Sequence, residues 1–230
     1  MFLGHFGLAF AAKRLAPRTS LGTLGAASQW VDLVWPLLLL AGVEHVQIDP
    51  GNTAYTPLAF THYPWTHSLL MSLAWALAFG LVYGVATGER RGAVVAGLLV
   101  ASHWVLDWVT HRPDLPVSPW SSGRHGLGLW NSVAATVMVE GVIFAGGVLL
   151  YARGTRPRWR SGSMGLWSLV GFLVAMAVAN QFTVPPDEWA VAAGTFSMWL
   201  LVLWMAWVDA RRQLVGDEEG VLGAKRAAPP

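Results

Sequence analysis

Five ionisable residues stand inside stretches of the chain that are otherwise apolar. They are Asp32, His67, His103, Asp107 and Glu140. A charged side chain near the centre of a lipid bilayer costs about 2.5–3.5 kcal/mol on insertion scales, so it normally faces a partner or a water-filled cavity. A hydrogen bond between two helices would explain any one of them alone. Their number and spacing favour a shared site.

The spacing is clearest for His103, Asp107 and His111, which follow one another at intervals of four residues. On a helix this interval puts the side chains on one face. Imidazole and carboxylate groups side by side are typical ligands of Zn²⁺, with Mn²⁺ or Fe as alternatives. His62 and His67 come from the preceding helix and the polar segment that leads into it.

Composition indicates that membrane-spanning helices carry these residues. The 230 residues are 54% hydrophobic and only 12% charged, whereas a soluble domain is usually about 25% charged. Six apolar stretches are about long enough to cross a bilayer. They are Thr19–Val43, Pro64–Thr87, Gly92–Val109, Leu127–Tyr151, Met164–Phe182 and Ala190–Trp207.

A further apolar stretch, Phe2–Leu15, is shorter. At about 1.5 Å per residue it reaches only about 20 Å, so it either spans incompletely or leans into the bundle. We therefore predict an all-α bundle of six or seven transmembrane helices, with one domain over residues 1–212 and a disordered cytoplasmic tail over residues 213–230. We expect Pro36 to kink the first full-length helix.

The distribution of basic residues predicts the orientation. Every lysine and arginine except Arg112 and Arg124 falls in alternate connections or in the C-terminal tail. The positive-inside rule makes that side cytoplasmic. This predicts a multi-pass protein of the inner membrane with a cytoplasmic C-terminus.

Helix geometry predicts the depth of the polar residues. Counting about 1.5 Å per residue from the cytoplasmic charges brings Asp32, His67, His103 and Asp107 to one layer in the outer half of the membrane. His5 joins that layer if the N-terminus is outside. Unrelated structural histidines would not be expected to gather in one half of the membrane in this way.

The sequence excludes several classes of function or gives them no support. The chain has no cysteine, which excludes disulfides, thiolate metal sites and a cysteine nucleophile. The formal net charge is only +2 and the basic residues lie in short loops, so no nucleic-acid partner is indicated. No internal repeat is evident, and an inverted-repeat transporter gains no support.

The spaced histidines and aspartates also carry a family resemblance over roughly residues 1–115. Asp32, His62, the run Thr66-His67-Ser68 and the run Ser102-His103-x-x-x-Asp107 resemble the motifs of the membrane-bound metal-dependent hydrolases regulated by LexA. The resemblance implies a helical membrane hydrolase distantly similar to zinc-dependent phospholipase C and P1-type nucleases. It matches His5, Asp32, His62, His67, His103 and Asp107. In this chain Asp32 has no second aspartate beside it, and Tyr63 stands where the family has arginine.

The leading hypothesis is therefore metal-dependent hydrolysis of a membrane lipid or lipid-linked phosphoester. The metal ligands are expected to be His5, Asp32, His67, His103 and Asp107. His62 and His111 are expected to complete the site, and Glu140 is the candidate for proton transfer or a partner of a ligating histidine. We expect the site to open toward the loop Thr110–Gly126.

Two other readings of the same residues stay open. The polar layer could bind an ion or proton and pass it across the membrane, which would need polar groups in the cytoplasmic half. Alternatively, the histidines could hold a purely structural metal in a membrane scaffold. Glu140 could also be a protonated carboxyl that hydrogen-bonds between helices.

Overall fold

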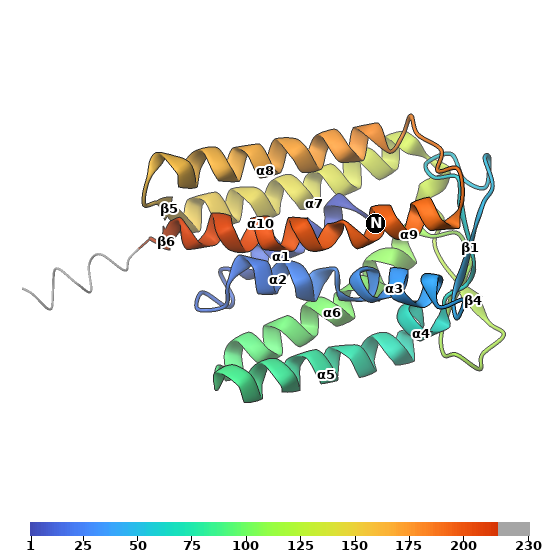
Figure 1. Ribbon diagram of the computed structural model, residues 1–230, viewed down its shortest axis with the longest axis horizontal. Helices are drawn as coiled ribbons and strands as arrows, with labels where there is room; N and C mark the ends of the chain where they lie inside the picture. The colour runs from blue at the N-terminus through green and yellow to red at the C-terminus, as the bar shows by residue number, and fades with distance from the viewer. Residues whose placement is uncertain (216–230) are drawn as a thin grey trace, which may run out of the picture.

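The computed structural model describes residues 1–215 and is an all-α helical bundle, as predicted (Figure 1). Its α-helices are α1 (Leu3–Ala12), α2 (Leu21–Ser28), α3 (Trp30–Leu40), α4 (Pro64–His67), α5 (Leu69–Thr87), α6 (Arg90–Thr110), α7 (Val133–Gly154), α8 (Arg160–Ala179), α9 (Glu188–Phe196) and α10 (Met198–Ala210), with a 3₁₀ turn η1 (Leu129–Asn131). Short strands are β1 (His45–Ile48), β2 (Leu58–His62), β3 (Leu115–Pro116), β4 (Arg124–His125), β5 (Thr155–Pro157) and β6 (Arg212–Leu214).

Five helical segments of the described chain are long and apolar enough to cross a membrane. They are α5, α6, α7, α8 and the continuous segment Glu188–Ala210, which contains α9 and α10. The bent pair α2–α3 makes a sixth if it is counted as one span, whereas α1 has only 10 residues. These features fit a membrane protein with an N-terminal helix that is too short to cross the bilayer.

Helix α1 lies inside the bundle, packed against α7 and α2. Its contact with α7 is close because Gly7 and Gly147 face each other, and a methyl group added to Gly147 would collide with the carbonyl oxygen of Gly7. Small residues allow helices in a membrane to approach in this way. The N-terminal segment therefore leans into the bundle, one of the two arrangements expected for it.

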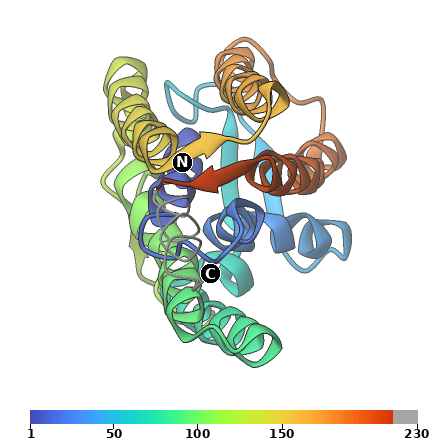
Figure 2. The ribbon, with the colours of Figure 1, turned by 90° about the vertical axis from the view of Figure 1, so that its left-hand side faces the viewer.

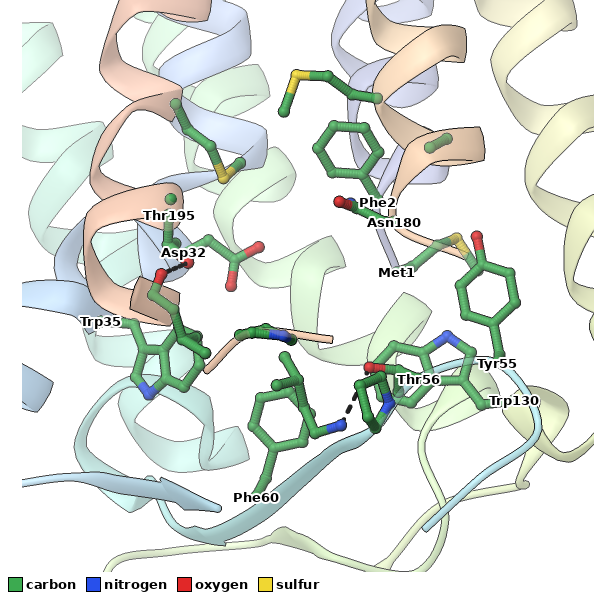
Figure 3. A pocket seen from close by; sticks show the side chains of 18 of the residues that line it. Met1, Phe2, Asp32, Trp35, Tyr55, Thr56, Phe60, Trp130, Asn180 and Thr195 are labelled. Carbon is green, nitrogen blue, oxygen red and sulfur yellow. Dashed lines mark hydrogen bonds between the residues drawn. The ribbon is translucent and has the colours of Figure 1, made fainter. Parts of the chain in front are cut away.

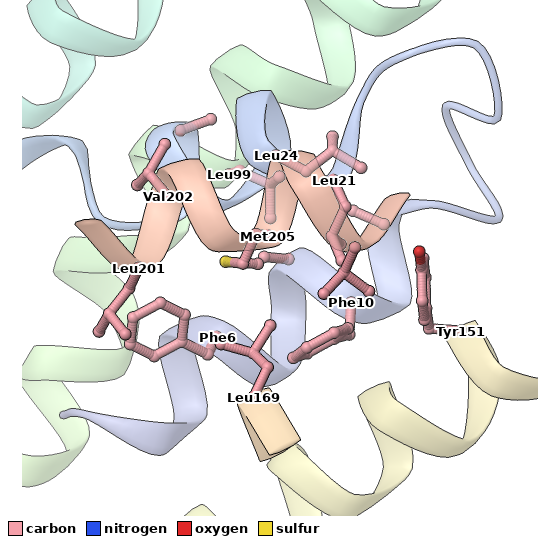
Figure 4. Packing of buried hydrophobic residues seen from close by; sticks show 14 of the residues in the cluster. Phe6, Phe10, Leu21, Leu24, Leu99, Tyr151, Leu169, Leu201, Val202 and Met205 are labelled. Carbon is pink, nitrogen blue, oxygen red and sulfur yellow. The ribbon is translucent and has the colours of Figure 1, made fainter. Parts of the chain in front are cut away.

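The apolar core fills the half of the bundle that carries most of the arginines, which we call the basic end. Phe6 and Phe10 of α1 pack there with Leu24, Tyr151 and Met205 (Figure 4). Strands β5 and β6 pair antiparallel at this end, as Figure 2 shows. Residues 213 and 214 of the predicted tail thus belong to a strand, and the tail from residue 216 onward lies outside the described residues.

The opposite end of the bundle, which we call the hairpin end, is covered by the antiparallel strands β1 and β2 (Figure 1). Val46 of β1 is buried in a second, smaller apolar cluster with Trp35, Tyr63, Leu115 and Val191. The sequence indicated only a long connection here. The strands are too short to show a clear alternating pattern in the sequence, and the apolar residues that they cover belong to helices far away along the chain.

Helix breaks at the hairpin end differ from the prediction. The first full-length helix is interrupted at Gln29, where α2 and α3 meet at 56°, whereas Pro36 lies within α3. The segment that begins at Pro64 is also divided, because Ser68 is extended and its hydroxyl accepts a hydrogen bond from the Met71 amide at the start of α5. Non-helical backbone at membrane depth is tolerated where protein surrounds it.

Candidate functional site

Four helices bring the five predicted ligand residues together toward the hairpin end. Helix α1 supplies His5, α3 supplies Asp32, α4 supplies His67, and α6 supplies both His103 and Asp107. One ligand atom from each of His5, His103 and Asp107 lies within 4.8 Å of the others, and the same holds for Asp32, His67 and His103. All are buried except Asp32, whose side chain is 22% exposed.

The Asp107 carboxylate lies at the centre of this His/Asp cluster. Its Oδ1 is 3.1 Å from His5 Nε2 and 2.6 Å from the Met1 amino group. Its Oδ2 is 3.1 Å from His103 Nε2 and 3.9 Å from His67 Nε2. One carboxylate therefore faces three imidazoles from three different helices.

The break between α2 and α3 orients His103. The Ser28 carbonyl oxygen at that break lies 2.9 Å from His103 Nδ1. A carbonyl oxygen can only accept, so Nδ1 carries a proton, and Nε2 is the nitrogen that presents a lone pair whenever the ring is neutral. This Nε2 is buried and hydrogen-bonds to no described residue, although oxygens of Asp107 and Asp32 lie 3.1 and 3.6 Å away.

A chain of buried polar groups orients His67. The Thr66 hydroxyl donates to Glu44 Oε2 at 2.7 Å, and it lies 2.7 Å from His67 Nδ1. With its proton directed to Glu44, the hydroxyl accepts from His67 Nδ1–H. His67 Nε2 lies 3.2 Å from Asp32 Oδ1 and would donate to it when protonated, whereas a bound metal ion would take the place of that proton. In metal sites, a carboxylate that does not itself bind the ion often orients a histidine ligand in a similar way, through the other ring nitrogen.

Glu44 is the site residue that sequence reasoning missed. Its side chain is fully buried, and Oε1 accepts from the backbone amides of Trp65 and Thr66 at 2.7 and 2.9 Å. In the sequence it is simply the first polar residue of a predicted loop. The only signal was an acidic residue directly after an apolar stretch, which is too common to be selective.

Glu140 binds the start of α1. Its Oε2 accepts from the backbone amides of Phe2 and Gly4 at 2.9 and 3.3 Å. A carboxylate at a helix N-terminus satisfies free amides and matches the helix dipole. Glu140 thus holds the helix that carries His5, and its other oxygen makes no hydrogen bond with a described residue. Its proposed part in proton transfer stays a prediction.

His111 lies beyond the His/Asp cluster, on α6's C-terminal side. Its Nδ1 is 2.9 Å from Asp114 Oδ1, and the Tyr63 hydroxyl donates to the same oxygen at 2.7 Å. Burial, reinforced by the neighbouring Asp114 carboxylate, raises the pKa of the Tyr63 phenol well above its usual value, so the hydroxyl stays a donor. A histidine held by a carboxylate is a suitable general acid or base.

His62 is not in the cluster. It ends β2, is exposed, and faces His45 across the hairpin with ring centroids 6.4 Å apart. Because it comes just before the helix that carries His67, the sequence predicted that His62 would lie close to the metal ligands. The backbone instead turns at Tyr63, which is buried while His62 points to the surface.

A cavity of about 390 Å³ adjoins the His/Asp cluster. Asp32 points into it and aromatic side chains line it, among them Trp35, Phe60 and Trp130 (Figure 3). His67, Asp107 and His111 also lie along its wall. Of the predicted opening Thr110–Gly126 only His111 contributes, and the residues around α8 and α9 form the opposite wall.

The donor set suits a borderline divalent ion. Histidine nitrogen and aspartate oxygen are the ligands that Zn²⁺ takes in catalytic sites, where protein ligands leave a position open for water or substrate. The buried Nε2 of His103 is a fitting ligand atom, because it lies between the Asp32 and Asp107 carboxylates and makes no hydrogen bond with a described residue. The exposed edge of Asp32 gives the cluster access to the cavity.

Comparison with known proteins finds no family model, no curated protein and no solved structure that matches this chain. The resemblance to the LexA-regulated hydrolases therefore stays a prediction that rests on the motifs.

Proposed function

We propose that this protein is a membrane metal-dependent hydrolase that acts on a lipid or lipid-linked phosphoester. The observation that carries the proposal is the convergence of His5, Asp32, His67, His103 and Asp107 beside one cavity. Zn²⁺ is the ion we expect, with Mn²⁺ or Fe as alternatives. Such an ion, when bound, supplies Lewis-acid activation of water and of a phosphoryl oxygen at neutral pH.

The protein's own residues have separate roles in this proposal. The Ser28 carbonyl and the Glu44–Thr66 pair keep the ring nitrogens of His103 and His67 directed at the cluster. His111, held by Asp114 at Nδ1, lines the cavity and is the group that moves a proton. Aromatic and apolar side chains make up much of the remaining wall of the cavity.

The membrane setting follows from the charges at the two ends. The arginine-rich basic end is assigned to the cytoplasm by the positive-inside rule, which puts the cavity in the outer half of an inner membrane and the C-terminus inside. A substrate in the outer half of the membrane is then a lipid or is carried by one.

The distribution of polar groups supports an enzyme over a conduit. Transport would need polar groups that continue from the cluster to the basic end. In the described chain the apolar core around Phe6, Phe10 and Leu24 occupies much of that half. Its buried polar groups, the Lys13–Asp209 ion pair with the Tyr151 hydroxyl, form a separate network. The cavity is lined only by residues of the hairpin end and the adjoining helix turns.

Elemental analysis of detergent-purified protein tests the proposal. Wild type should contain bound Zn, Mn or Fe, and His103→Ala and Asp107→Ala should lose it while their helical circular dichroism is unchanged. His125→Ala removes an exposed histidine of β4 and should keep the metal. If the wild-type protein contained no metal even after reconstitution with each ion, the hydrolase proposal would be contradicted.

A further inference from the structure

The cavity is covered on its water side. In the loop between β1 and β2, the Tyr55 amide donates to the Trp130 carbonyl at 3.0 Å, and the Gln181 side-chain amide donates to the Tyr55 carbonyl at 3.3 Å. The Val46 amide of β1 donates to Glu188 Oε1 at 3.3 Å. The hairpin is thus fixed to η1, to the end of α8 and to α9. A substrate from the aqueous side would have to displace it.

The cavity has a mouth on the side of the bundle, between α8 and α9. Asn180, Gly194 and Ser197 line the cavity and are also exposed. The surface around them is apolar, with Phe182 84% and Phe196 49% exposed. Because α8 and the α9–α10 segment are both candidate spans, this mouth lies on the face that meets lipid tails.

Apart from the divalent ion of the proposed function, which the Asp32 and Asp107 carboxylates would bind, the described residues give the cavity no fixed positive charge for a strongly anionic group. No lysine or arginine among the described residues lines it, and the Met1 amino group is already paired with Asp107. Arg112 lies 3.5 Å from Asp114, while Arg124 donates to loop carbonyls outside the cavity. No lysine or arginine of the described chain is therefore available in the cavity to balance a dianion, whereas aromatic walls suit apolar and cationic groups.

We propose that the substrate is a bilayer lipid with a neutral or zwitterionic head, which reaches the His/Asp cluster sideways between α8 and α9. This inference rests on the proposed function and narrows its substrate class. The lipid tails stay in the membrane at the mouth while the head passes Asn180 and Gly194 into the cavity. Water-soluble esters are disfavoured because the hairpin covers the cavity on its water side. Lipids that end in a phosphomonoester are disfavoured because no lysine or arginine within residues 1–215 lines the cavity.

Photo-crosslinking in nanodiscs tests the route without requiring turnover. The probe is phosphatidylcholine with a diazirine near its head group, and labelled sites are mapped by mass spectrometry. We expect label on the cavity walls, in the segments Met176–Asn180 and Thr195–Met198, in addition to label on the lipid-facing side of α5. Label on α5, where Val85 is 88% exposed, serves as the internal reference.

A pair of glycine variants supplies the control. Gly194 and Gly171 both have open space where a side chain would begin, but only Gly194 lines the cavity. Gly194→Phe should reduce cavity labelling several-fold relative to α5, and Gly171→Phe should leave it unchanged. Equal cavity labelling in wild type and Gly194→Phe would overturn the lateral route.

Two further readouts separate this inference from the proposed function. A phosphatidic acid probe that labels the cavity as well as phosphatidylcholine does would overturn the proposed head-group charge. Metal content and lipid hydrolysis are measured on the same samples. A wild type that binds no metal counts against the hydrolase, whereas unchanged labelling and hydrolysis in Gly194→Phe with metal bound counts only against the route.

Discussion

The rings of His5 and His103 stack face to face, with centroids 3.7 Å apart and planes within 5° of each other. This contact joins the short helix α1 to α6. His103 is therefore fixed on its face by His5 and at its Nδ1 by the Ser28 carbonyl. Its remaining nitrogen has little freedom to point anywhere except between Asp32 and Asp107.

This geometry predicts a single metal ion. Both groups of ligand atoms in the cluster include His103, and with Nδ1 bonded to Ser28 only Nε2 is left for a metal. We expect metal-free protein to saturate at one equivalent of Zn²⁺ in a titration followed by desalting and elemental analysis. Retention of two equivalents through desalting would contradict the prediction.

Glu44 and Thr66 are predicted to control metal affinity from outside the ligand set. Glu44→Gln removes the charge behind the Thr66 hydroxyl, and Thr66→Val removes the link to His67. Each should weaken Zn²⁺ binding by about 10–100-fold, the usual effect of losing such a partner, as measured by competition with a fluorescent chelator.

Two variants control for general effects of these substitutions. Thr66→Ser keeps the hydroxyl and should restore most of the affinity. Asp49→Asn neutralises an exposed carboxylate in the connection between β1 and β2 and should bind Zn²⁺ like wild type. If Glu44→Gln also matched wild type, the polar chain to His67 would have no influence on the metal.

His111 is predicted to act in turnover and not in metal binding. It lines the cavity and is bonded to Asp114, but it belongs to neither group of ligand atoms. His111→Ala should keep its metal and lose about 10²–10⁴-fold in hydrolysis rate, the range for general acid–base catalysis. The measurement pairs elemental analysis with lipid hydrolysis, using His125→Ala for comparison. Metal loss in His111→Ala would instead make it a ligand.

Gly147→Ala is predicted to loosen α1. The added methyl meets the Gly7 backbone, whereas Gly141 on the same helix has open space. Overpacking of this kind costs about 1–3 kcal/mol, so the thermal unfolding midpoint in detergent should fall for Gly147→Ala and stay near wild type for Gly141→Ala. Because α1 carries His5, metal affinity should fall as well. Equal midpoints would mean that the two helices separate without cost.

The sequence predicted what is encoded locally. Apolar runs of spanning length gave the helical bundle, and the interval between His103 and Asp107 gave the shared face on α6. The sequence pointed to Pro36 and not to the break at Gln29, because the Ser28 carbonyl at that break bonds to His103, 75 residues further along the chain. The burial of Glu44 likewise depends on Thr66 in another element. Such contacts leave no periodic pattern that a single sequence displays.

The interrupted helix has a consequence for biogenesis. Helices α2 and α3 have 8 and 11 residues, so neither half can cross a bilayer by itself. The Ser28 carbonyl between them receives its partner only when α6 has been made and inserted. The bend between α2 and α3 can therefore be completed only after α6 has been made, and the maturation of this segment is tied to the assembly of the cluster.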